Sequence, residues 1–188
     1  MAEMNPLHTF QGHTGRVYSV AASFLADGRR IAASASHDRT VRVWDLETQQ
    51  LLRSIDYSDF VWRVFIVTKP RPVIVAFVAA EGKIQVSDLD TGETISIFYG
   101  RLVTCCYMPP FKQVVILTAS EEDACFLDVT GRQLLLLKGG FEKMFRAAIT
   151  QGSRTLLAFT TWNSQNRSST INTYDMTEDE AGAGTGYG

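Results

Sequence analysis

The sequence predicts an all-β protein built from repeated four-stranded units. Most apolar segments alternate with polar residues or are short β-branched runs, as in VYSVAAS, TVRVWD and KIQVSDL, and both patterns are typical of strands. Turn signals such as Asp27-Gly28 and the DTGE stretch at 90–93 separate them at the spacing of antiparallel hairpins. Four apolar strands open at intervals of 44, 42 and 42 residues, at Val17, Val61, Val103 and Phe145. A period near 42 residues indicates a repeat architecture.

Each complete unit contains four predicted strands, ordered from inner to outer. In the first unit they are expected at about 17–23, 30–36, 40–45 and 50–55. In the second unit they are expected at about 61–67, 72–80, 83–88 and 94–99. In the third unit they are expected at about 102–107, 113–119, 124–128 and 133–137. The fourth unit supplies three, at about 144–150, 154–161 and 170–175, with an extended polar loop expected at 161–169.

The two ends of the chain complete this count. Residues 177–188 are acidic, small and Gly-rich, which predicts a flexible tail. Residues 7–11, LHTFQ, precede the first unit in the phase of an outer strand. We expect this strand to complete the fourth unit and to cap its open edge. The predicted domain spans 1–176, with units at 12–56, 57–100, 101–139 and 140–176.

Composition places the chain among ordinary globular proteins. The 188 residues are 45% hydrophobic and 20% charged, with a formal net charge of −2, so charge gives no reason to expect binding to nucleic acid or an anionic membrane. The apolar segments are too short or too interrupted to span a bilayer. Cys105, Cys106 and Cys125 have no zinc-site spacing and are expected as free thiols. We therefore expect a cytoplasmic or nuclear protein without metal or cofactor.

Two segments, GHTGRVYSV at 12–20 and ADGRRIAASASHDRTVRVWD at 26–45, resemble a repeat of the WD40 β-propeller family. The resemblance rests on the order of its parts: Gly-His before the first strand, Asp-Gly after it, a polar Asp turn, and Trp-Asp at the end of the third strand. The other three units share the period and strand pattern but few of these residues. The resemblance implies a WD40-type propeller with four blades per chain.

The same resemblance implies a buried hydrogen-bond network in the first blade. His13 would bind Asp38 with one ring nitrogen and a strand hydroxyl with the other, Ser34 rather than Ser36. That hydroxyl would also meet the indole N–H of Trp44. A network of this kind satisfies polar groups that are costly to bury alone. We interpret it as structural, because the alternative of a hydrolase triad lacks a nucleophile elbow or oxyanion-hole motif.

Four blades leave the mode of ring closure open. A compact four-bladed ring, an eight-bladed ring from two chains, and pairing with a partner that supplies the remaining blades all fit the sequence. We favour a symmetric dimer, in which residues 7–11 would complete the fourth blade of the other chain. The chain would then be half of a composite propeller.

The resemblance implies a non-catalytic scaffold that binds a protein or peptide partner at the narrow end of the propeller. Aromatic and arginine residues at this end are the types that anchor interfaces. Carrying positions over from the family predicts these partner-binding residues: Arg16, Tyr18, His37, Arg39, Trp62, Arg63, Arg101, Thr104 and Arg146. For Trp62 a core position is the alternative, since a one-residue slip of VWRV exchanges the faces of the strand. A hydrolase-type enzyme is the alternative function.

Overall fold

The computed structural model describes residues 7–69, 71–108, 113–119, 123–138, 147–150, 156–163 and 168–175. These residues form antiparallel sheets in which each strand pairs with the next along the chain. The first sheet contains β1 (Val17–Phe24), β2 (Arg30–Ser36), β3 (Thr40–Asp45) and β4 (Leu51–Asp56). The second contains β5 (Val61–Val67), β6 (Val73–Val78), β7 (Lys83–Asp88) and β8 (Thr94–Tyr99), with the short 3₁₀ helix η1 (Ala80–Gly82) before β7.

The later sheets follow the same order. The third sheet contains β9 (Arg101–Met108), β10 (Gln113–Ala119), β11 (Asp123–Leu127) and β12 (Gln133–Lys138). The fourth contains β13 (Ala147–Thr150), β14 (Leu156–Asn163) and β15 (Ser168–Asp175). Every strand predicted between residues 17 and 175 is present, so the predicted all-β architecture is confirmed.

One loop prediction was wrong. Residues 161–169 were expected as an extended loop, but β14 continues to Asn163 and β15 begins at Ser168, with Thr161 paired to Thr170. Threonine and tryptophan favour strands even in a polar stretch, because their side chains pack well on a pleated surface. Residues 164–167 lie outside the described part of the chain.

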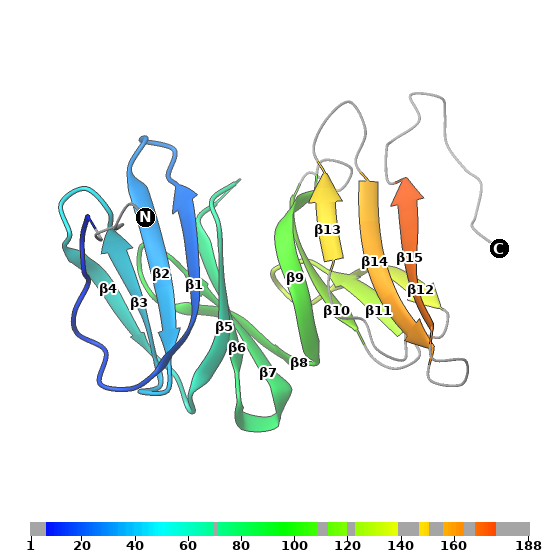
Figure 1. The fold of residues 1–188 in the computed structure, drawn as a ribbon, viewed down its shortest axis with the longest axis horizontal. Coiled ribbons are helices and arrows are strands. Elements are labelled where there is room, and N and C mark those ends of the chain that lie inside the picture. The colour runs from blue at the N-terminus through cyan, green and yellow to red at the C-terminus, as the bar shows by residue number, and fades with distance from the viewer. Residues whose placement is uncertain are drawn as a thin grey trace, which may run out of the picture.

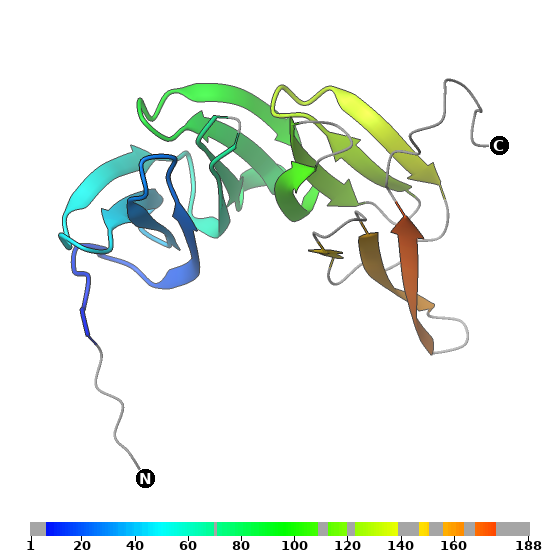
Figure 2. The same cartoon turned by 90° about the horizontal axis from the view of Figure 1, so that it is seen from above.

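The sheets follow one another along an open arc, with the first sheet (blue) and the fourth (orange) at its two ends (Figures 1 and 2). Strand β5 packs against β1 and β2 of the preceding sheet and contacts β9 of the following one. Ser19 adds a direct link, since its Oγ accepts the backbone N–H of Val64 at 3.3 Å. Successive sheets therefore stack face to face through their inner strands.

The core lies between the sheets. The first interface buries Ile31, Ala33, Val41 and Val43 of the first sheet against Val61, Val64, Ile74 and Ala76 of the second. The second interface buries Val73, Val75, Ile84 and Val86 against Cys105, Val114 and Ile116. A sheet covered on both faces requires apolar residues at consecutive positions, which explains the run VIVAFV in β6. Full burial of one such side chain contributes about 1.5–3 kcal/mol.

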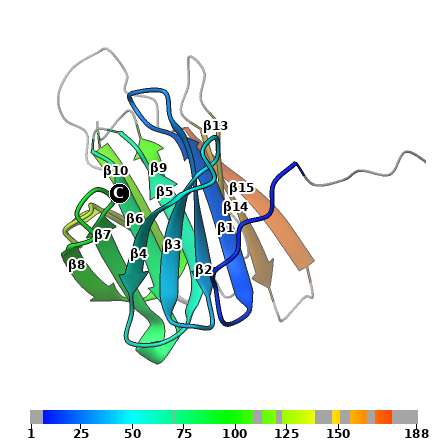
Figure 3. The same cartoon turned by 90° about the vertical axis from the view of Figure 1, so that its left-hand side faces the viewer.

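The N-terminal segment differs from its prediction. Residues 7–11 form no strand in this chain; they lie beside the first sheet, where the Phe10 ring centroid is 5.5 Å from that of Trp44 (Figure 3). The fourth sheet comprises β13, β14 and β15, without an N-terminal strand. In this structure the segment does not complete that sheet, because the two lie at opposite ends of the arc (Figure 2).

Candidate functional site

The hydrogen-bond network expected around His13 is present in the first sheet. His13 Nδ1 lies 2.8 Å from Asp38 Oδ2, and His13 Nε2 lies 2.7 Å from Ser34 Oγ. The indole Nε1 of Trp44 donates to Ser34 Oγ at 2.9 Å. Asp38 also accepts the Thr40 hydroxyl at 2.7 Å. The network therefore ties the loop before β1 to β2, β3 and the turn between them.

The electrostatics of the network determine the direction of its hydrogen bonds. Partial burial alone would raise the pKa of Asp38, but hydrogen bonds from Thr40, His13 and the Thr14 backbone N–H outweigh it and hold that pKa well below its ordinary value. An ionised carboxylate only accepts, so His13 Nδ1 carries a proton. Because an indole N–H only donates, Ser34 accepts from Trp44 and can direct its own proton to His13 Nε2.

The same geometry gives little access to a substrate. Ser34 is 7% exposed and Trp44 is 6% exposed. The Ser34 hydroxyl already accepts the Trp44 N–H, and the Phe10 ring packs at a tilt beside the indole. We therefore interpret the network as a structural element of the first sheet.

The aspartate of the Trp-Asp pair has a role that recurs in the following sheets. Asp45 Oδ1 accepts the backbone N–H groups of Glu47 and Thr48, each at 2.8 Å. Asp88 and Asp128 make the same kind of contact with the turns that follow β7 and β11. The tryptophan is replaced by Ser87 and Leu127, whereas the turn-capping carboxylate is retained. The backbone hydrogen bonds lower the pKa of Asp45 and Asp88.

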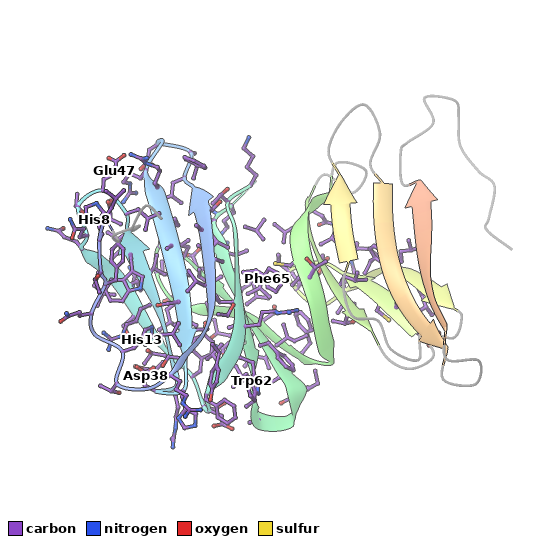
Figure 4. All side chains as sticks on the ribbon, in the orientation of Figure 1. His8, His13, Asp38, Glu47, Trp62 and Phe65 are labelled. Carbon is purple, nitrogen blue, oxygen red and sulfur yellow. The ribbon has the colours of Figure 1, made fainter. Side chains whose placement is uncertain are left out.

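A cluster of four aromatic rings lies at one end of the first two sheets; we call it the aromatic cluster, and it consists of Tyr18, His37, Phe60 and Trp62. The Tyr18 and Trp62 centroids are 4.6 Å apart, and Phe60 lies 5.1 Å from both Trp62 and His37. His37 stacks on Phe60 at an interplanar angle of 17°. Figure 4 shows Trp62 at the same end of the sheets as His13 and Asp38.

Two β-bulges determine the orientation of the Tyr18 and Trp62 rings of this cluster. In the first sheet Val17 pairs with Ser36 and Ser19 with Ala35, so Tyr18 is the extra residue. In the second sheet Val61 pairs with Val78 and Arg63 with Phe77, so Trp62 is the extra residue. A bulge takes one residue out of the ladder and redirects its side chain. Trp62 is consequently 47% exposed, which decides against a core position.

The third sheet shifts this pattern by one residue. Thr104 pairs with Leu117 and Leu102 with Thr118, so the extra residue of β9 is Val103. Val103, and not Thr104, is therefore the register equivalent of Tyr18 and Trp62. The even repeat spacing led to Thr104, because spacing alone does not show where a bulge inserts its extra residue.

A close backbone contact holds the His37 turn against the loop before β1. The His37 N–H donates to the Arg16 carbonyl oxygen at 2.8 Å. A Cβ on Gly15 would lie 2.8 Å from the Asp38 backbone nitrogen, so this approach requires glycine. Arg39 takes a φ of 68°, a left-handed conformation that is uncommon for residues other than glycine. The turn thereby presents His37 and Arg39 to solvent on either side of Asp38.

Several cationic residues are close in sequence to the members of the aromatic cluster. Arg16, Arg39 and Arg63 are exposed. The Arg63 guanidinium lies 5.9 Å from the Phe65 ring centroid. Lys83 Nζ lies 3.4 Å from Ser58 Oγ in the loop that leads to Phe60. The side chain of Arg101 and the whole of Arg146 lie outside the part of the structure that can be described.

Phe60 belongs to the cluster but was not predicted. It precedes Val61 as Arg16 precedes Val17, so the repeat spacing that pointed to Arg16 contained the signal for Phe60 as well.

Within the described ranges, no group of three or more His, Cys, Asp or Glu residues is placed to hold a metal ion. No helix in the described part of the chain is long and apolar enough to cross a membrane.

Comparisons with known proteins agree with this geometry. A family model described as WD domain, G-beta repeat matches residues 4–45. The target of rapamycin complex subunit wat1 of Schizosaccharomyces pombe is 44% identical over 53 residues. Residues 4–45 are therefore a WD40 repeat. The match to wat1 covers 28% of this chain and 16% of that protein.

A solved structure is similar to this chain in its fold. The crystal structure of the computationally designed Ika4 protein aligns with a TM-score of 0.63 over 92% of this chain and 99% of that chain. The two are 18% identical, so the likeness concerns the fold alone. The predicted β-propeller fold class agrees with it.

Proposed function

We propose that this WD40 chain is a non-catalytic scaffold that binds a protein or peptide partner at the end of the sheets carrying the aromatic cluster. The observation that carries the proposal is the exposed Trp62 ring, which two bulges place against Tyr18. Partly exposed aromatic rings held by their neighbours provide large contact area at low entropic cost. The family match supports a protein-interaction role.

The charged residues next to the cluster in sequence favour one class of partner. Arg16, Arg39 and Arg63 are exposed, whereas the chain as a whole carries a formal charge of −2. Positive charge around an apolar contact attracts acidic segments and fixes their register. The best fit is a partner segment with an aliphatic or aromatic anchor flanked by acidic residues.

The relative suggests where such a partner is found. Because wat1 is a target of rapamycin complex subunit, we propose that this chain assembles into a complex of that kind, in the cytoplasm. Self-association into a dimer, forming a composite propeller, is a second proposal. It concerns the exposed Val20 and Phe24 on β1 and not the aromatic cluster.

Affinity purification of the tagged chain from its own cells tests the scaffold proposal. Trp62→Ala should reduce co-purified target of rapamycin complex by at least about tenfold, the loss expected of an anchor residue. Ile97→Ala is the matched control, because Ile97 is also 47% exposed but lies on the outer strand β8. Equal recovery with Trp62→Ala and Ile97→Ala would rule out the aromatic cluster as the docking surface.

A further inference from the structure

A lysine and a serine meet in the loop that leads to the aromatic cluster. Lys83 Nζ lies 3.4 Å from Ser58 Oγ, and Ser58 is two residues before Phe60. Ser58 is exposed and Lys83 is partly exposed. The Tyr57 N–H donates to the Arg39 carbonyl oxygen at 2.8 Å, which fastens this loop to the turn between β2 and β3. The pair is therefore held between that turn of the first sheet and strand β7 of the second.

The hydrogen-bonding capacity of the pair indicates the kind of group that it binds. An ammonium group only donates, so Lys83 donates to Ser58 Oγ and the serine hydroxyl keeps its own hydrogen for another acceptor. A contact of 3.4 Å is long for a hydrogen bond, so the ammonium group is only loosely held. Both groups can donate to one further oxygen, and an anionic oxygen makes the strongest bond of this type.

The neighbouring carboxylates do not neutralise Lys83. Asp59 Oδ1 accepts the Phe60 backbone N–H at 2.8 Å. Asp56 follows Ile55 on β4, and Ile55 is buried in the core between the first two sheets. Because successive side chains of a strand point to opposite faces, Asp56 is directed away from that core. Lys83 makes no ion pair with any residue that the structure describes, so its charge is available to a partner.

The register of the second sheet gives the distance from this pair to the aromatic cluster. Val61 pairs with Val78, and Val78 pairs with Lys83, so the backbones of Val61 and Lys83 are two strand spacings, or about 10 Å, apart. Trp62 directly follows Val61. An extended segment advances about 3.3 Å per residue, so this distance corresponds to about three residues of a bound segment.

We propose that Lys83 and Ser58 select an acidic residue about three positions from the apolar anchor that the partner segment places on Trp62. This inference rests on the proposed function and adds the spacing of the recognised motif to it. The aromatic cluster provides the contact area, whereas the acidic contact determines where the anchor lies along the segment, because charge complementarity mainly fixes register and specificity. Segments with their acidic residues at other positions should bind more weakly.

A peptide library displayed on phage and selected on the full chain tests this spacing. The peptides kept for comparison are those that no longer bind Trp62→Ala. Among them, Asp or Glu should be enriched about three positions from an apolar residue. Selection on Lys83→Glu should replace this preference by Lys or Arg, because the introduced carboxylate repels an acidic side chain. Lys69→Glu is the matched control and should retain the acidic preference, because Lys69 is also exposed but follows the opposite end of β5.

One peptide from the wild-type selection then measures the contact by isothermal titration calorimetry. Changing its acidic residue to the amide should weaken binding to the wild type by about twofold to fivefold, the range of an exposed ion pair. The same change should leave binding to Lys83→Gln unaffected. Ser58→Ala should lower the affinity by less than Lys83→Gln does, because a neutral donor is weaker than a charged one. Near-ultraviolet circular dichroism of each variant checks that the fold is retained.

Two results would overturn the inference while leaving the scaffold proposal in place. The first is a set of Trp62-dependent peptides without acidic enrichment at this spacing. The second is an acidic preference that Lys83→Glu leaves unchanged. If no selected peptide depends on Trp62, the proposed docking surface is itself wrong and the inference fails with it, so the two failures are distinguishable.

Discussion

Tyr18 and Trp62 occupy equivalent positions in the first two repeats, and their ring centroids lie 4.6 Å apart. Each is the extra residue of a bulge near the start of an inner strand, so the rings leave their ladders and meet between β1 and β5. Their contact joins two sheets while Trp62 keeps 47% of its surface exposed. The same pair therefore contributes to packing and to the surface proposed for partner binding.

A double-mutant cycle on this pair should reveal a favourable coupling. Tyr18→Ala, Trp62→Ala and the double variant are expected to give a coupling free energy of about 0.5–1.5 kcal/mol, as for other aromatic pairs. Urea unfolding followed by circular dichroism measures the three free energies of unfolding. Strict additivity would show that the two rings do not stabilise the junction of the sheets.

Removal of the network histidine should destabilise the fold. His13→Ala leaves Asp38 and the buried Ser34 without their shared partner, and we expect a loss of about 1–3 kcal/mol in the free energy of unfolding. His8→Ala is the matched control, because His8 is exposed, and it should change stability by less than about 0.5 kcal/mol. Unchanged stability in His13→Ala would contradict the structural interpretation and favour a catalytic one.

The Asp38 carboxylate should make stability depend on pH in the acid range. Its pKa is lowered in the folded state, so the unfolded chain binds the proton more readily. Stability from this group is therefore complete above its ordinary pKa of 3.8 and is lost as the pH falls below that value toward the folded pKa. Urea midpoints from about pH 6 to about pH 3 should fall less steeply in Asp38→Asn than in the wild type.

Asp27→Asn provides the comparison for that measurement. Asp27 also has a lowered pKa, caused by the Arg29 backbone N–H and guanidinium, but its side chain is 52% exposed and solvent screens the pair. The acid slope of Asp27→Asn should match that of the wild type. A slope in Asp38→Asn equal to the wild-type slope would show that the network carboxylate does not contribute to acid unfolding.

Local patterns were sufficient to predict the strands and the first-sheet network. The alternation of apolar and polar residues in β3 and the turn residues around Asp27-Gly28 are local signals. They predict a strand and a turn without any knowledge of what packs on them. Where propensity and polarity disagreed, as over 161–169, the β-branched and aromatic residues of β14 outweighed the polar ones. The resemblance at 12–45 supplied His13, Ser34, Asp38 and Trp44 together, because their roles are tied to one repeat.

The aromatic cluster was only partly predictable. Tyr18, Trp62 and His37 followed from their positions in the repeat, but Phe60 and the shift from Thr104 to Val103 did not. A bulge shifts the strand pairing by one residue without changing the length of the repeat. The repeat spacing of 42 residues therefore cannot predict where the bulge lies.

By itself the sequence determined the four-unit, all-β organisation of this chain, since strand periodicity and turn chemistry are local. Only the tertiary structure decided the open arc, the position of residues 7–11 beside the first sheet, and the exposure of Val20 against the burial of Val64. The physical reason is that two equivalent valines have the same local sequence signal. Whether each is buried depends on whether a neighbouring sheet lies over it.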